Sequence, residues 1–76
     1  MLRIHYTNHA LDVLRERKLS KELVESVIFS PEWKEPVSGD VWCGFKRIER
    51  KVLRVVIKGR HGPLTVITAY YDRRKT

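Results

Sequence analysis

The sequence has little of what marks a secreted, membrane-spanning or disulfide-stabilised protein. A single cysteine stands among its 76 residues, so no disulfide can form within the chain. A lone thiol is typical of a reducing cytoplasm. No apolar run approaches the roughly 20 residues that span a bilayer, and the first ten residues lack the apolar stretch of a signal peptide. We therefore expect a cytoplasmic protein with no membrane association.

Motifs for cofactors and metals are also missing. The chain contains no P-loop, no dinucleotide fingerprint and no paired catalytic carboxylates. Its three histidines and Cys43 do not have the spacing of a zinc site. We expect no cofactor and no metal, and we expect Cys43 to be a small buried apolar residue.

Positive charge is abundant, and its excess over negative charge lies entirely in the second half of the chain. The formal net charge is +7. Residues 1–38 hold six Lys and Arg against six Asp and Glu, whereas residues 39–76 hold ten against three. A one-sided basic surface suits a polyanion or an acidic protein segment. The alternative is a merely soluble surface, because a charge of this size is ordinary for a small domain.

Two apolar runs in residues 52–71 predict a β-hairpin. Both are rich in β-branched and aromatic residues. The break from Gly59 to Pro63 contains glycine and proline, so it is a turn whose tip carries Arg60 and His61.

The side chains of the first run of the hairpin alternate between two faces. Its apolar residues can be covered on one face, while Arg54 and Lys58 point to the other. The second run is mostly apolar on both faces. Whether Thr68 and Tyr70 join Arg54 and Lys58 depends on the hairpin register, which the turn leaves open.

Helical signals fill the first half of the chain. Thr7 and Ser20 stand as N-caps before apolar residues at helical spacing. Pro31 ends the second helix, because the residue before a proline is pushed out of the helical region. The pattern predicts a strand at Leu2–Tyr6, helices at about Asn8–Arg17 and Lys21–Ile28, a strand at Val41–Ile48, and room for a short strand at Trp33–Val37.

This order predicts a single α+β domain over residues 1–76. Two N-terminal helices would pack on one face of a twisted antiparallel sheet in the order β-α-α-β-β-β. Positions that share a face at helical or strand periods form the expected core: Ala10, Val13, Leu14, Leu23, Val27, Leu53, Val55 and Ile57.

Three local motifs accompany this order: Thr7-Asn8-His9-Ala10, Arg17-Lys18-Leu19-Ser20 and Thr68-Ala69-Tyr70. With them the chain resembles a family of small uncharacterised prokaryotic proteins. One departure is Lys18, where that family often has glycine, and a lysine at a left-handed helix end would be mildly strained. The wider pattern resembles RelE/ParE-type and BrnT-type toxins.

The resemblance implies a toxin-like RNA-binding domain. Its activity would be that of an mRNA endonuclease, and its partners would be RNA or the ribosome and a cognate antitoxin. Carrying the activity over is an analogy, because such folds host other roles. The alternative is a non-catalytic module whose basic sheet binds RNA or an acidic protein segment. The sequence decides neither this choice nor the oligomeric state.

RNA cleavage through the 2′-hydroxyl requires a general base, a general acid and cations around the phosphate. The catalytic candidates are two imidazoles, two cations and a tyrosine: His61, His9, Arg54, Lys58 and Tyr70. The candidate nucleic-acid contacts are other cations of the second half: Lys46, Arg47, Arg60, Arg73 and Arg74. A phosphate held by Arg54 and Lys58 would reach His61 if the hairpin tip folded back over the sheet. Otherwise His61 is a binding contact on a mobile tip, and His9 is a packing or capping residue.

Overall fold

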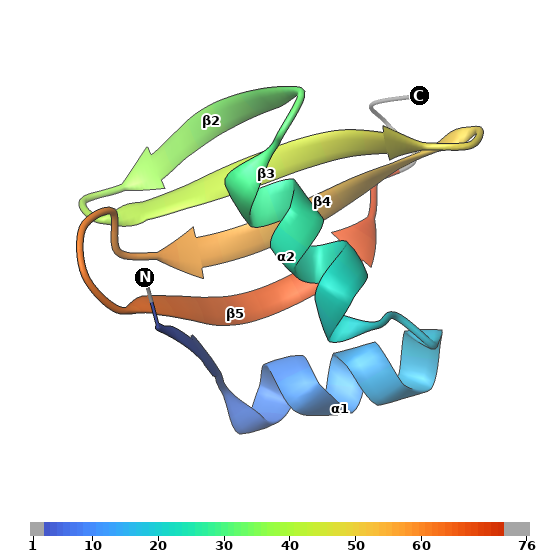
Figure 1. The fold of residues 1–76 in the computed structure, drawn as a ribbon, viewed down its shortest axis with the longest axis horizontal. Coiled ribbons are helices and arrows are strands. Elements are labelled where there is room, and N and C mark those ends of the chain that lie inside the picture. The colour runs from blue at the N-terminus through green and yellow to red at the C-terminus, as the bar shows by residue number, and fades with distance from the viewer. Residues whose placement is uncertain (1–2, 73–76) are drawn as a thin grey trace.

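The computed structural model describes residues 3–72, which form two helices and a five-stranded sheet (Figure 1). The predicted order of strand, two helices and further strands is confirmed, and the short strand after the helices is present. The elements are β1 (Ile4–Tyr6), α1 (Asn8–Arg17), α2 (Lys21–Phe29), β2 (Trp33–Ser38), β3 (Val41–Ile48), β4 (Lys51–Lys58) and β5 (Leu64–Tyr71).

The sheet is mixed, so the prediction of an antiparallel sheet is wrong for one strand. The strand order is β1-β5-β4-β3-β2, and β2 to β5 form an antiparallel meander. β1 pairs in parallel with β5, with Ile4 opposite Leu64. Short hairpin connections force neighbouring strands to be antiparallel. β1 is instead connected through α1 and α2, so no hairpin fixes its direction.

One irregularity explains why β5 reads as apolar on both faces. The register of β4 with β5 shifts after Val56. Val56 lies opposite Thr68, but the next residue, Ile57, lies opposite Val66. Ile67 is therefore unopposed, as in a β-bulge. The bulge brings Leu64 and Val66 onto the same face as Ala69, and all three are buried against the helices.

Thr7 ties the start of α1 to this bulge. Its hydroxyl accepts a hydrogen bond from the Ala10 N–H at 3.0 Å and donates one to the Ile67 carbonyl at 3.2 Å. Ala10 is buried against the sheet, whereas His9 is exposed. Thr7 and Ala10 of the Thr7-Asn8-His9-Ala10 motif are therefore structural residues. His9 of the same motif has no packing role in the core.

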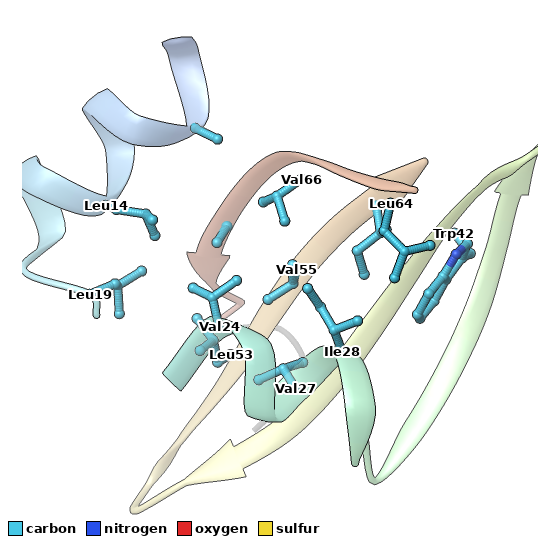
Figure 2. Packing of buried hydrophobic residues seen from close by; sticks show 13 residues of the cluster. Leu14, Leu19, Val24, Val27, Ile28, Trp42, Leu53, Val55, Leu64 and Val66 are labelled. Atoms are coloured by element: carbon cyan, nitrogen blue, oxygen red, sulfur yellow. The ribbon is translucent and has the colours of Figure 1, made fainter. Parts of the chain in front are cut away.

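Both helices cover one face of the sheet, and the main core lies between the two layers (Figures 1 and 2). Most of the predicted core is confirmed, since the buried cluster includes Ala10, Leu14, Val27, Leu53, Val55 and Ile57. Leu23 packs at the margin of this cluster. Val13 is half-buried and lies outside it, because α1 turns only the stripe of Ala10 and Leu14 fully toward the sheet.

Gly44 lets α2 approach β3 closely. A Cβ at this position would lie 3.1 Å from the Val27 carbonyl oxygen and 3.4 Å from Val27 Cγ1. A larger residue would force the helix away from the strand, since a well-packed interior has little room to yield. The glycine in β3 is thus explained by packing on the helix face.

Tyr6 links β1 to α2. Its hydroxyl donates a 2.7 Å hydrogen bond to Glu25, and Lys21 Nζ lies 5.1 Å from the centre of its ring. Burial, followed by this bond to a carboxylate, raises the pKa of Tyr6 well above its ordinary value. Tyr6 therefore stays a neutral hydrogen-bond donor, which suits a structural tie.

Lys18 ends α1 in the left-handed conformation, with φ 56° and ψ 42°. Its N–H and that of Leu19 bond back to carbonyls of the last turn, including Leu14. This arrangement normally uses glycine.

Replacing Lys18 with glycine is expected to stabilise the protein by about 0.5–1 kcal/mol. The left-handed conformation costs an ordinary residue roughly 1–2 kcal/mol, and glycine avoids this cost. Part of the gain is offset because glycine loses more conformational entropy on folding. Urea unfolding would report the change as a higher midpoint at unchanged slope. Lys18→Ala is the matched control, because alanine keeps the strain. Equal midpoints for the two variants would contradict the prediction.

Candidate nucleic-acid interface

The sheet face turned away from α1 and α2, here called the outer face, carries a row of four planar side chains. Trp33 lies opposite Phe45, Phe45 opposite Arg54, and Arg54 opposite Tyr70. The row, here called the aromatic row, therefore crosses β2, β3, β4 and β5. It also settles the register question, because Tyr70 and Thr68 share the outer face with Arg54 and Lys58.

The four planar groups of the aromatic row stack on one another. The rings of Trp33 and Phe45 are nearly parallel, at 3° between planes and 5.0 Å between centres. The guanidinium carbon of Arg54 lies 5.2 Å from the centre of the Phe45 ring and 5.8 Å from that of Tyr70. Such contacts between a guanidinium and aromatic faces are favourable. Phe45 is fully buried, whereas Trp33 and Tyr70 are half-exposed.

Arg54 is held by two polar partners as well. Its Nη1 donates to Asp72 Oδ2 at 3.1 Å, and its Nε donates to the Cys43 sulfur at 3.4 Å. The bond to Cys43 raises the pKa of Arg54 above its ordinary value, although burial acts in the opposite direction. The side chain of Asp72 is 5% exposed and that of Arg54 is 22% exposed. The charge of Arg54 is thus balanced by a buried carboxylate.

A small apolar cluster on the outer face includes part of the aromatic row. Cys43, Phe45 and Val52 are buried on the outer face, and Trp33 and Val56 pack against them. Burial of Cys43 confirms the expectation from the sequence. Because Phe45 belongs both to this cluster and to the row, the row packs against apolar neighbours on the same face.

Two of the expected cations lie exposed on the outer face. Lys58 is on β4, four residues and roughly 13 Å from Arg54. Arg47 is opposite Val52, and its backbone N–H donates to the Glu32 carboxylate at 3.2 Å. Lys46 lies opposite Leu53, on the helix face.

The histidine candidates do not meet the cations. His61 and Arg60 are exposed in the loop that follows β4, beyond Lys58. His9 is exposed in the first turn of α1, on the helix side of the sheet (Figure 1). Of the catalytic candidates, the structure brings together Arg54, Lys58 and Tyr70 on the outer face. Arg73 and Arg74 lie outside the described residues.

The base of the β4–β5 loop is fixed to β3. Gly59 has φ 107°, and a Cβ there would lie 2.8 Å from the Pro63 carbonyl oxygen, so the turn requires glycine. The Gly59 N–H donates to the Asp40 carbonyl at 2.9 Å, and its carbonyl accepts from Trp42 Nε1 at 2.7 Å. Trp42 is therefore a core residue with a hydrogen-bonded edge and is not available for stacking on a ligand.

Sequence reasoning did not assign Trp33, Asp72 and His5 to the outer face. The face that Trp33 occupies depends on the register of β2 with β3. The sequence signal that could have identified Asp72 is its position, since it is a carboxylate directly after an apolar strand. His5 is exposed. It lies opposite Thr65, which itself lies opposite Lys58.

No metal site or membrane-spanning helix is found in the described part of the chain. Within residues 3–72 no group of three or more His, Cys, Asp or Glu side chains could hold a metal ion. None of the helices there is long and apolar enough to cross a membrane.

Fold and site together define a small α+β domain with two helices on one face of a mixed sheet and a stacked aromatic row on the other. The chain belongs to the family described as Domain of unknown function (DUF4258), whose model matches residues 6–71. The match runs from the end of β1 to the end of β5. No curated protein and no solved structure matches the chain. The expectation of a small uncharacterised domain family is thus confirmed, and no link to RelE/ParE-type or BrnT-type toxins is shown.

Proposed function

We propose that the protein is a toxin-like RNA-binding domain that holds single-stranded RNA on its outer face. The observation that carries this proposal is the aromatic row, which presents half-exposed rings of Trp33 and Tyr70 on either side of Arg54 and the buried Phe45. Aromatic platforms beside basic residues are the usual means of binding single-stranded nucleic acid.

The two exposed rings would contact different nucleotides. Trp33 and Tyr70 are separated by three strand spacings, roughly 14 Å. Each ring would receive one base, which is worth about 1–3 kcal/mol per base and is tolerant of sequence. Lys58 and Arg47, exposed on either side of the row, would contact the backbone phosphates.

The geometry of the outer face supports RNA binding better than it supports RNA cleavage. An endonuclease would need an acid, a base and unpaired positive charge around one phosphate. Arg54 is paired with Asp72, and His61 and His9 lie away from the aromatic row. The proposal is therefore of a binding domain. An RNA or ribosome target and a cognate antitoxin remain the partners that the resemblance to toxins implies.

A titration of the protein with single-stranded RNA at several salt concentrations tests the proposal. If three or four phosphates are neutralised, the logarithm of the binding constant should fall with the logarithm of the salt concentration with a slope of about −2 to −3. A poly-glutamate peptide of equal charge is the control for the alternative partner, an acidic protein segment. Absence of RNA binding at low salt would remove the proposal, and equal affinity for the peptide would favour the alternative.

A further inference from the structure

We propose a second contact for the RNA, a phosphate-binding site at one corner of the outer face. This site, here called the corner site, consists of His5, Thr65 and Lys58. The three residues lie in register on the neighbouring strands β1, β5 and β4. This inference rests on the proposed function, since it names the phosphate contact that accompanies stacking on the aromatic row.

The three side chains point to the same face of the sheet. Side chains alternate along a strand, and the neighbours of each residue face the core. Thr65 stands between buried Leu64 and Val66, and Lys58 follows buried Ile57. The neighbours of His5 are Ile4 and Tyr6, which pack against the main core cluster. His5 and Lys58 are themselves exposed.

The chemistry of the corner site suits a phosphate. An ammonium group and an imidazole flank a hydroxyl, so donors would approach the phosphate oxygens from both sides. The Cα atoms of His5 and Lys58 lie two strand spacings apart, roughly 10 Å, which leaves room for one phosphate group above Thr65. Arg3, which is exposed two residues before His5, adds positive charge.

Few carboxylates lie near enough to compete. Among residues 3–72, Asp40 is in the turn beside this end of β4, where its carbonyl accepts from the Gly59 N–H. Glu35 is on the outer face, but it lies on β2 opposite Cys43, at the other side of the sheet. Positive charge therefore dominates the corner site.

The position of the corner site predicts the path of the RNA across the outer face. Thr65 and Tyr70 lie on the same strand, roughly 15 Å apart. An RNA strand whose base stacks on Tyr70 would follow β5 and place a phosphate a few nucleotides away between His5 and Lys58. This path turns the strand away from the line of the aromatic row.

Affinity measurements on variants of the corner site test the inference. Lys58→Ala should weaken binding of an oligouridylate about tenfold at low salt, the effect of one lost charged contact, and should reduce the salt slope by about 0.7. His5→Ala should weaken binding by about twofold to tenfold. The double variant should lose less than the product of both effects, because the two side chains share one phosphate.

Arg15→Ala is the control, since Arg15 is an exposed cation in the helical layer. If Lys58→Ala and His5→Ala weaken binding no more than this control while the wild type binds RNA, the corner site is wrong and the proposed function stands. If the wild type binds no RNA, the proposed function fails, and NMR titration with inorganic phosphate decides the corner site. Saturable shifts of the His5 ring signals that disappear in Lys58→Ala would support it, and their absence would overturn it.

Discussion

Replacing Asp72 with alanine is expected to destabilise the protein by about 2–3 kcal/mol. The carboxylate is buried at the end of β5 and accepts a 3.1 Å hydrogen bond from Arg54. Removing one partner of a fully buried ion pair costs about 3–5 kcal/mol, because the other charge is left without compensation. Arg54 is 22% exposed, so water would recover part of this loss. Thermal unfolding should show a decrease in Tm of about 10 °C or more.

Three further variants separate the ion pair from other causes. Asp40→Ala removes an exposed carboxylate in a turn and should change Tm little. Asp72→Asn keeps the shape and should still be destabilised, because the charge is lost. Arg54→Leu combined with Asp72→Leu should recover part of the stability, since apolar residues can replace a buried pair. An effect of Asp72→Ala no larger than that of Asp40→Ala would show that the pair does not stabilise the fold.

The local elements could be predicted because their signals are local. Thr7 and Ser20 cap the two helices as expected, each accepting from the N–H three residues later. The left-handed end of α1 at Lys18 follows from the short connection between the helices. The direction of β1 could not be predicted, since no hairpin turn joins it to β5 and its pairing depends on the packing of both helices.

The bulge at Ile67 shows why alternation failed for one strand. At the bulge, β4 and β5 pair unequally, and the Ile67 carbonyl accepts a hydrogen bond from Thr7, which lies 60 residues away in the sequence. Leu64 and Ala69 differ in the parity of their sequence positions, yet both are buried on the helix face. Strict alternation along an unbroken strand would place them on different faces.

The outer face was harder still to predict, because it depends on several registers at once. A shift of one residue in any pair of strands would reverse the faces of one of its members. Arg54 and Lys58 could be placed together, since they lie on one strand. The stack of Trp33 on Phe45 and the pairing of Arg54 with Asp72 required the assembled sheet. The sequence therefore identified the cations and Tyr70, but not the placement of Trp33, Phe45 and Asp72 around Arg54.

Loss of both exposed rings of the aromatic row is expected to have the largest effect on RNA binding. Trp33→Leu and Tyr70→Leu keep an apolar side chain at each position but remove the aromatic plane. Each should weaken binding about tenfold, and the double variant about a hundredfold, because a stacked base contributes about 1–3 kcal/mol. The salt slope should stay at its wild-type value, since no cation is removed. Anisotropy titrations of labelled oligouridylate at several salt concentrations would measure both quantities.

Phe29→Leu provides the matched control. Phe29 is an aromatic residue at the end of α2 and is 55% exposed, so its replacement also removes an accessible ring. It lies in the helical layer, on the other side of the sheet from the aromatic row (Figure 1). Its loss should leave the affinity for RNA unchanged. An equal loss of affinity in Phe29→Leu, or a decrease of the salt slope in the double variant, would mean that the rings of Trp33 and Tyr70 do not stack on bases.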